Sequence, residues 1–484
     1  MSVTPSLRNA VLETDHVARC ADRKAPAFVA LSDRIWGMPE LRFEETRSME
    51  EHVRALEAEG FRITRDLAGI PTAFMAEAGE GDVTIGFLGE FDALAGLSQE
   101  AGATEQRPLE EGGNGHGCHH NLLGAASLLA TVALRDALAE SGVRARVRYY
   151  GCPAEEGGSG KTYMARAGSF DDLDAAFCWH PCVYNAVMSA STLANIQAYF
   201  RFTGRASHAG ISPHVGRSAL DALELMNVGV NFMREHMPPE ARVHYAITGT
   251  GGISPNVVQA SAEGLYLVRA PRLDDVQRLF ERVRKIADGA ALMTETSVEM
   301  VFDRATSNVL PNRALEEAMD EEFQAIGPPR FDAADFAFAD RLRAVAITDE
   351  DVRAAADSFG GPADYPRSLH DAILPLPDKP GLLPGSTDVG DVSWVVPTAQ
   401  CLTATAAVGT PFHNWQTVTQ GKLPAAHKAM VVAAKVMAAT AARAISDPDL
   451  LARAKAELVA RRGGGPYRSP LPDGVGVPTS SSRR

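Results

Sequence analysis

The sequence predicts an α/β protein in which a mostly parallel sheet is interrupted by an inserted domain that has a sheet of its own. Three features support this prediction. In the first third of the chain, short apolar runs alternate with helix-like stretches, which is typical of a parallel sheet. From about residue 193, apolar and polar residues alternate as on a half-exposed strand. The elements that follow have the order βαββαβ, the ferredoxin-like arrangement with helices on one face.

The elements of the mostly parallel sheet come from two stretches of the chain. Before the insertion, we expect a helix at 50–60, a strand at 83–88, a helix at 122–140, and strands at 146–150 and 175–179. After it, we expect a helix at 308–326, a strand at 399–408 and a helix at 423–445. Residues 327–385 are rich in proline, glycine and aspartate, and they predict a long surface excursion near a functional mouth.

The inserted domain is expected to span residues 193–303. Its predicted elements are a strand from Ala194, a helix at 218–237, strands at 243–248 and 262–269, a helix at 273–295 and a strand at 297–302. The first domain is then discontinuous, with residues 1–192 and 304–462. Residues 463–484 are rich in glycine, proline and serine, so we expect a disordered tail.

The composition argues against several classes of partner. The 61 acidic residues outnumber the 47 basic ones, and the net charge of −14 is unfavourable for binding nucleic acid. No stretch reaches the roughly 18 consecutive apolar residues of a membrane span, and the N-terminus lacks the pattern of a secretory signal. The six cysteines are scattered, as free thiols or ligands in a reducing compartment would be. We therefore expect a cytoplasmic protein that binds neither nucleic acid nor membranes.

The strongest chemical signal is the run GHGCHHN from Gly115 to Asn121, which holds three histidines and a thiol. It lies on the loop before the helix predicted at 122–140. Cys118 and His120 therefore place two side chains that can bind a metal at the start of that helix. The alternative is a polar turn with a helix cap at Asn121.

Two adjacent carboxylates, Glu155 and Glu156, follow the strand predicted at 146–150. Open parallel sheets bind ligands beyond the carboxyl ends of their strands. Adjacent side chains on an extended segment point in opposite directions, so one carboxylate can bind a metal while the other stays free as a general base. The alternative is a solvated acidic turn.

His180 and His413 each follow a predicted strand of the same sheet. Either one alone is better explained as a hydrogen-bonded core or cap residue, but four strand ends that all offer ligands are poorly explained by coincidence. The candidates also exceed one tetrahedral site, which favours two divalent metal ions, zinc or manganese. The candidate ligands are Cys118, His120, Glu156, His180 and His413, with Glu155 left to act as general base on a metal-bound water.

Seven ordered motifs between residues 30 and 445 resemble those of the aminoacylase/carboxypeptidase-like di-metal peptidase family, and within it the p-aminobenzoyl-glutamate hydrolase type of amidohydrolase. They are WGMPEL at 36–41 with FEE at 43–45, GFLGEFDAL at 86–94, CHHN at 118–121, PAEEGG at 153–158, GRASHA at 204–209, SPNVV at 254–258 and GSTDVGD at 385–391. The resemblance implies a catalytic di-metal domain with an inserted lid and dimerisation domain.

The resemblance also implies roles for single residues. The five candidate ligands would bind the metal pair, and Glu155 would be the base. Asp92 is similar to a carboxylate that orients a ligand imidazole from behind. His208 is similar to a histidine that stabilises the tetrahedral oxyanion, often from the neighbouring subunit. Asn256 and Arg269 match lid positions that engage the substrate, and the fork of Arg269 suits a carboxylate.

Structural alternatives stay open for three of these residues: Asp92 as the cap of a strand, Arg269 in a surface ion pair and His208 as the cap of a loop. The chain also departs from the family pattern. His119 stands where glycine is usual between the cysteine and histidine ligands, so a ligand register through His119 is an open alternative. The excursion at 327–385 is longer than the resemblance leads us to expect, which leaves the outer substrate pocket undefined.

The resemblance implies a metal-dependent hydrolase of N-acyl or N-aroyl amino acids, with p-aminobenzoyl-glutamate-like substrates first. The alternatives are a dipeptidase or aminopeptidase on the same scaffold, or a hydrolase of other conjugates such as indole-acetyl amino acids. A non-catalytic binding protein is disfavoured because it has no use for a free Glu155. We expect a homodimer through the inserted domain, since a free edge strand can pair with its twin. A companion subunit encoded elsewhere is the alternative.

Overall fold

Seven strands form the sheet of the larger domain, which we call the main domain, in the order β1-β2-β4-β3-β5-β13-β6. β3 pairs in parallel with β4 and β5, and β5 pairs in parallel with β13, whereas the pairs toward both edges are antiparallel. The predicted mostly parallel sheet is therefore confirmed. The computed structural model describes residues 12–478, and its strands here are Arg62–Arg65 (β1), Phe74–Gly79 (β2), Thr84–Glu90 (β3), Arg146–Cys152 (β4), Ala175–Cys182 (β5), Ala186–Val187 (β6) and Thr398–Ala404 (β13).

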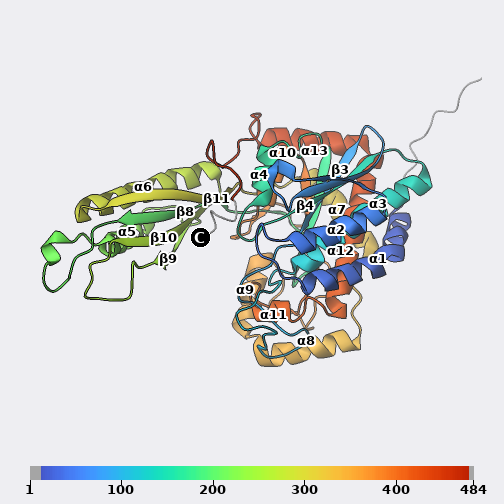
Figure 1. Cartoon of the computed structure of the whole chain (residues 1–484). Coiled ribbons are helices and arrows are strands. Elements are labelled where there is room, and N and C mark those ends of the chain that lie inside the picture. Colours follow the sequence, from blue (N-terminus) through green and yellow to red (C-terminus); the bar gives the residue numbers. More distant parts are fainter. Residues whose placement is uncertain (1–11, 479–484) are drawn as a thin grey trace, which may run out of the picture.

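Helices cover both faces of this sheet (Figure 1). The residues of β3 are buried throughout because alternate side chains enter different cores. Phe87 lies on one face, in a core that four helices share with α2 (Thr46–Ala58) and α13 (Pro448–Arg461), and Leu88 lies on the other face with two helices. The first group is α1 (Thr14–Trp36), α3 (His120–Ser141), α7 (Arg313–Ile326) and α12 (Pro424–Ser446), and the second is α4 (Gly160–Arg166) and α10 (Val389–Val395). The remaining helices of the main domain include α11 (Trp415–Val418).

Helices α3 and α12 are long and apolar enough to cross a membrane by length and composition alone. In the structure, 83% and 72% of their most apolar windows are buried inside the protein. Both pack against α1 and against each other in the main core. Their hydropathy is therefore accounted for by their position as core helices.

The inserted domain has a four-stranded antiparallel sheet in the order β11-β8-β10-β9. Alternate residues of β8 are buried under two helices, while Gln197, Tyr199 and Arg201 lie half-exposed on the open face. The observed order is βαββαβ, as predicted from the alternating pattern. Its elements are β8 (Ala194–Thr203), α5 (Ala219–Arg234), β9 (Arg242–Gly249), β10 (Ser261–Ala270), α6 (Leu273–Thr294) and β11 (Ser297–Thr306).

The chain enters the inserted domain on β8 and leaves it on β11, and these two strands are neighbours. Asn195 pairs with Thr306 in their ladder, and the Asn195 side chain donates a hydrogen bond to Thr306 Oγ1 at 2.7 Å. The inserted domain projects from the main domain beyond this paired crossing (Figure 1).

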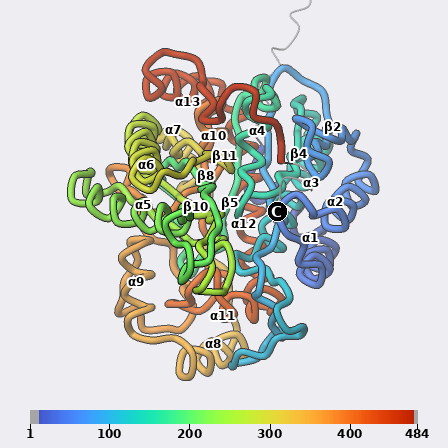
Figure 2. The backbone as a smooth tube through the Cα atoms, turned by 60° about the vertical axis from the view of Figure 1, so that its left-hand side comes forward, coloured from blue at the N-terminus to red at the C-terminus, as the bar shows by residue number. Residues whose placement is uncertain are grey.

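Residues 327–385 differ from the expected irregular excursion because they contain two helices. α8 (Ala333–Ala346) and α9 (Asp349–Phe359) each begin with a capping box. The apolar period of α8 is weak, whereas that of α9 is clear although few of its side chains are buried. Figure 2 shows this pair of helices and α13 at opposite ends of the main domain. The buried residues are Asp335, Ala339 and Leu342 in α8, and Val352 and Ala356 in α9.

The tail also differs from its expectation. Residues 463–478 contain no helix or strand, but they are packed against the main domain. Tyr467 donates a hydrogen bond to Asp391 at 2.9 Å, and Leu471 is 5% exposed. Burial of two apolar side chains orders a segment whose composition alone predicts disorder. Residues 479–484 and 1–11 lie outside the described residues, and the domain boundaries stay a prediction.

Candidate metal centre

The candidate site lies where the parallel strands of the main sheet end. Glu90 is the last residue of β3, and Asp92 follows it, while Glu155 lies in the loop after β4. His180 is near the end of β5, and the first turn of α3 begins with His120. Because these strands are parallel, their carboxyl ends meet at one edge of the sheet.

The five predicted ligands form two groups that share Cys118. The ligand atoms of Cys118, His120 and His180 lie within 4.8 Å of one another, and so do those of Cys118, Glu156 and His413. Cys118 Sγ is 3.5 Å from His180 Nε2, and Glu156 Oε2 is 3.3 Å from His413 Nε2. The structure therefore brings all five predicted ligand side chains together as two adjoining triplets.

A close backbone approach positions the loop of His413 against the loop of Cys118. The His413 N–H donates to the carbonyl of Gly117 at 2.9 Å. A Cβ at Gly117 would lie 2.6 Å from Leu97 Cδ1 and 3.3 Å from His413 Cα, so a side chain does not fit there. Glycine at this position thus permits the contact that places His413 beside Cys118.

His119 points away from the two triplets. Its ring is fully buried, with Nδ1 3.0 Å from Thr405 Oγ1 and Nε2 2.6 Å from the carbonyl of Thr417. Both ring nitrogens are therefore occupied by protein partners. The geometry favours a ligand register through Cys118 and His120 over the alternative through His119.

Asp92 and Glu90 lie on the two sides of the His120 ring. Asp92 Oδ1 is 3.0 Å from His120 Nδ1, and Glu90 Oε2 is 3.3 Å from His120 Nε2. The other oxygen of Asp92 accepts a hydrogen bond from the Glu156 N–H at 2.9 Å. Asp92 thus contacts the two ligand segments at once, as a carboxylate that orients ligands would.

Sequence reasoning missed a buried lysine beneath the site. Lys161 is fully buried, and its Nζ lies 2.6 Å from Glu90 Oε1 and 2.5 Å from Asp388 Oδ1. Asp388 Oδ2 also accepts from the Lys161 N–H at 2.8 Å. Glu90 and Asp388 stand inside the motifs at 86–94 and 385–391. A charged residue at the end of an otherwise apolar strand is the signal that could have found Glu90.

Burial controls the protonation of the carboxylates. It raises the pKa of Glu155 well above its ordinary value, and the negative charges of Glu90 and Glu156 raise it further. Burial also raises the pKa of Glu156 to about 7 and that of Asp388 to about 6. For Glu90 burial acts in the same direction, but the charges of Lys161, His120 and His180 together outweigh it and lower the pKa. Without a further cation, the centre therefore holds more carboxylates than it has positive charges to pair with them.

The residues present fit a pair of divalent cations. Among the described residues, Glu156 Oε1 is buried without a hydrogen-bond partner, and Glu90 Oε2 and His120 Nε2 make no hydrogen bond beyond their mutual 3.3 Å contact. Burial also raises the pKa of the Cys118 thiol, which a bound cation would reverse. Unpartnered buried polar atoms are costly, and one thiol, three imidazoles and a carboxylate are donors that divalent transition metals accept.

Left-handed backbone conformations gather in the loops of the centre. His119, Ala154, Ser159 and His413 have φ values of 57°, 61°, 56° and 59°, where non-glycine residues are uncommon. The buried Glu45 holds one of these loops, because it accepts the Ala154 N–H at 2.9 Å. Such strain persists only where surrounding contacts fix it, and it is typical of functional loops.

The predicted residues of the inserted domain fall at opposite ends of its sheet. His208 and Asn256 lie in exposed loops beyond the end of β8 and before the start of β10. Between Asn195 and Thr203, β8 extends over roughly 27 Å. Arg269 lies at the other end, next to the main domain, where it pairs with Asn195. One chain therefore does not bring His208 or Asn256 to the ligand triplets.

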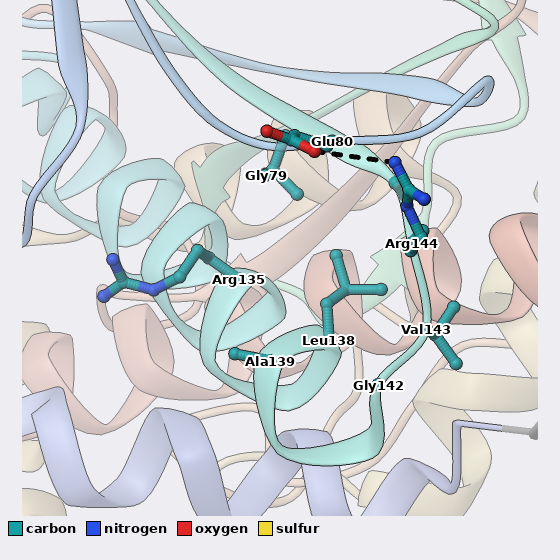
Figure 3. Close-up of a pocket in the computed structure, with 10 residues that line it drawn as sticks. Gly79, Glu80, Arg135, Leu138, Ala139, Gly142, Val143 and Arg144 are labelled. Carbon is teal, nitrogen blue, oxygen red and sulfur yellow. Dashed lines mark hydrogen bonds and ion pairs between the residues drawn. The ribbon is translucent and has the colours of Figure 1, made fainter.

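A separate pocket lies at the opposite edge of the main sheet, near the first residues of β3 and β4. It has a volume of about 270 Å³ and is lined by the end of α3 and by the 79–80 and 142–147 segments. Figure 3 shows Glu80 and Arg144 paired above it, at 3.5 Å. The pocket is far from the strand ends that carry the ligand residues, and it plays no part in the centre.

Residues 194–294 match the family described as "Peptidase dimerisation domain". The chain is 49% identical to one of the subunits of p-aminobenzoyl-glutamate hydrolase from Escherichia coli strain K12, over 94% of this chain and 96% of that protein. It is 34% identical to Xaa-Arg dipeptidase of Mus musculus, over 63% of this chain and 70% of the relative. A dinuclear metal-binding peptidase of the M20 family from Bacillus subtilis has the same fold, with a TM-score of 0.56, 18% identity, and coverage of 87% of this chain and 98% of that one.

Proposed function

This chain belongs to the M20 family of di-metal peptidases and amidohydrolases, and on that premise we propose that it hydrolyses N-acyl or N-aroyl amino acids. The relative with 49% identity is named for p-aminobenzoyl-glutamate, so we place conjugates of that kind first. Within this class of substrates, we place conjugates of other acyl groups, such as indole-acetyl amino acids, after those of p-aminobenzoate.

The observation that carries the proposal is the pair of ligand triplets beside Glu155. Cys118 belongs to both triplets, whereas Glu155 belongs to neither of these two and instead lies within 4.8 Å of Glu90 and His120 in a third group. A centre of this kind needs ligands that hold cations and a separate group that moves protons. The two adjacent glutamates provide both, with Glu156 as ligand and Glu155 as base.

We propose zinc or manganese as the metal, held by Cys118, His120, Glu156, His180 and His413. When bound, the two cations would acidify a water molecule and polarise the carbonyl of the scissile amide. Asp92 would keep the His120 ring in place through its 3.0 Å contact with Nδ1. Lys161 would balance the charge of Glu90 behind that ring.

Glu155 would move the proton between water and the leaving nitrogen. Burial and the neighbouring carboxylates raise its pKa in the cation-free centre, and positive charge nearby would lower that pKa. A carboxylate whose pKa lies near neutral pH can accept a proton from water and then deliver it to the amine that leaves.

His208 would stabilise the oxyanion from a second chain. It stands roughly 27 Å beyond the junction along β8, so it cannot serve the centre of its own chain without a large movement. We propose a homodimer through the inserted domain. The relative with 49% identity is itself named as one subunit of a hydrolase. A companion subunit encoded elsewhere is therefore the second candidate for the partner chain.

The test is a panel of N-acyl amino acids incubated with the purified protein and with the cytoplasmic fraction of cells that produce it. We expect hydrolysis of p-aminobenzoyl-glutamate after incubation with zinc or manganese, and loss of that activity on treatment with a chelator. A metal-loaded protein that cleaves no member of the panel would contradict the proposal.

A dipeptidase is the second candidate, and the 34% identity to Xaa-Arg dipeptidase favours it specifically. The two functions differ in whether the substrate needs a free α-amino group. Acetylating the α-amine of a cleaved dipeptide should abolish turnover by a dipeptidase. It should leave turnover by an N-acyl amino acid hydrolase largely intact.

A further inference from the structure

Two arginines of the inserted domain face the metal centre from different strands. Arg269 on β10 pairs with Asn195 of β8, and Arg304 on β11 pairs with Gln197 of the same strand. Asn195 and Gln197 are two residues apart, so their side chains share the open face of the sheet. The two arginine side chains therefore flank β8 at the end that joins the main domain.

A β-bulge aims Arg304 toward the centre. The ladder between β11 and β8 shifts register between Phe302 and Arg304, which adds one residue to β11. The Gln197 side chain donates a hydrogen bond to Asp303 Oδ2 at 2.6 Å, while Arg304 Nη1 donates to the carbonyl of Glu156 at 3.0 Å. Bulges of this kind redirect side chains next to functional sites. Arg304 thus touches the loop that holds a ligand and the proposed base.

Neither arginine has a carboxylate partner. Among the described residues, no carboxylate oxygen lies within 4.0 Å of either guanidinium, and the Nε atoms of both are buried without a hydrogen-bond partner. Arg201, on the same open face, is instead paired with Glu263 at 2.6 Å. Burial, and then the positive charge of Arg304, lower the pKa of Arg269. Two half-buried, mutually repelling cations next to the centre are an unsatisfied site for an anion with two charges.

We propose that Arg269 and Arg304 together bind the two carboxylates of a dicarboxylic amino acid, and that Arg304 selects the side-chain carboxylate. The amine released by hydrolysis would then be glutamate or aspartate. This inference rests on the proposed function, and it adds the specificity-determining residue and the charge of the amino-acid half of the substrate.

The spacing of the two strands suits such a ligand. Arg269 and Arg304 are separated by two strand spacings and by two residues along the strand, or roughly 12 Å between Cα atoms. Arginine side chains are long enough to close that gap around a dicarboxylate of four or five carbons. Each planar guanidinium can form two parallel hydrogen bonds to one carboxylate. A neutral amide in place of the second carboxylate would leave one buried guanidinium unpaired, which a site of this kind rejects strongly.

The test compares two isosteric substrates, p-aminobenzoyl-glutamate and p-aminobenzoyl-glutamine, which differ in one charge. We expect the wild-type protein to prefer the glutamate conjugate by about 100-fold in kcat/KM. Arg304→Met should lower kcat/KM for the glutamate conjugate by about 100-fold and that for the glutamine conjugate by less than about threefold. Arg304→Lys should recover part of the preference, because it keeps the charge without the fork.

Arg201→Met is the matched control, since it removes an arginine from the same face of the same sheet and should leave the preference unchanged. A second readout does not depend on turnover: calorimetric titration of each variant with free glutamate and free glutamine. We expect glutamate to bind the wild-type protein at least about tenfold more tightly than glutamine, and Arg304→Met to abolish that difference.

Two outcomes would overturn the inference. In the first, the wild-type protein distinguishes neither the two conjugates nor the two free amino acids. In the second, Arg304→Met lowers kcat/KM equally for the glutamate and the glutamine conjugate. Equal losses would mean that Arg304 only supports the Glu156 loop. If the wild-type protein cleaves neither conjugate but still binds glutamate through Arg304, the proposed function fails and the arginine site stands.

Discussion

The main domain and the inserted domain present their functional side chains in opposite ways. The main domain gathers ligands, base and counter-charges at one sheet edge, where Cys118 is 7% exposed and Lys161 is fully buried. The inserted domain spreads its candidates over both ends of an open sheet, with His208 exposed at one end and Arg269 at the other. The difference implies that one chain can assemble the proposed ligand set by itself, whereas the candidate substrate-binding residues depend on how domains and chains are placed around it.

The largest expected effect concerns the base of the main domain. Glu155→Gln should lower kcat by roughly 10²- to 10⁴-fold, because an amide cannot move the proton. The metal content should stay unchanged, since Glu155 is not one of the five proposed ligands, although it also lies within 4.8 Å of Glu90 and His120. Steady-state kinetics and metal analysis of the same preparation measure both. Glu263→Gln is the control in the inserted domain, and a Glu155→Gln variant as active as this control would contradict the assignment.

The second prediction concerns metal stoichiometry. Cys118 is shared by both triplets, while His180 and His413 belong to one each. Cys118→Ala should therefore lower the bound metal from two ions to nearly none, while His180→Ala or His413→Ala should each leave one ion. Metal analysis after dialysis distinguishes these cases. Retention of both ions by the Cys118 variant would show that the two triplets do not share a ligand.

The third prediction contrasts a buried ion pair with an exposed one. Lys161→Met leaves Glu90 and Asp388 buried without their cation, so it should lower the free energy of unfolding by about 3–5 kcal/mol. Arg201→Met breaks a partly exposed pair with Glu263 and should cost less than about 1 kcal/mol. Denaturant titrations in the presence of a chelator remove the contribution of metal binding. Adding Asp388→Asn to Lys161→Met should recover part of the loss, and equal effects of the two single variants would contradict the contrast.

The fourth prediction concerns acid. Burial lowers the pKa of His52 and of His116, each to about 3, below the usual 6.5 of an unfolded histidine. The unfolded chain therefore binds more protons between pH 6.5 and pH 3, so stability is lost as the pH falls through this window. At pH 5 the loss should be about 2 kcal/mol for each histidine.

This loss should be larger in the main domain, where His52 and His116 are fully buried. The histidines of the inserted domain, His208, His214, His236 and His244, are exposed, although burial and nearby arginines also lower the pKa of His244. Hydrogen exchange at pH 7 and pH 5 tests this, after correction for the intrinsic pH dependence of exchange. Peptides from α3 and β4 should lose protection, while those from β8 and β10 should keep it. Equal loss in both domains would contradict the prediction.

The smallest expected effect tests whether the inserted domain works across two chains. Glu155→Gln and His208→Ala should each be nearly inactive alone. If His208 serves the centre of a partner, an equimolar mixture after subunit exchange should recover about a quarter of the wild-type activity, since half of the dimers are mixed and each has one intact centre. No recovery in a mixture shown to contain mixed dimers would place His208 in its own chain.

Much of the fold could be predicted because its signals are local. The central strands are short apolar runs, and the alternation at 194–202 is sufficient by itself to indicate β8. The proximity of the five candidate ligand residues could be predicted because each follows a strand or opens a helix, and parallel strands converge at their carboxyl ends.

Other features depend on tertiary contacts that the sequence does not display. Lys161 reads as an ordinary polar residue of a short helix until the fold places it between Glu90 and Asp388. Arg304 is directed to the centre by a bulge that leaves no sequence signal. The apolar period of α8 is too weak to indicate a helix, and Tyr467 is ordered by a hydrogen bond to the distant Asp391.

The paired crossing of β8 and β11 has a mechanical consequence. Both connections leave the main domain side by side and are joined at Asn195 and Thr306. The inserted domain is therefore attached to the main domain through one two-stranded hinge. Bending of the inserted domain at this hinge would keep the β8–β11 ladder intact, whereas twisting about the strand axis would break its hydrogen bonds. Bending there would separate Arg304 from the carbonyl of Glu156, so a movement of the inserted domain would also release one contact of the loop that carries the proposed base.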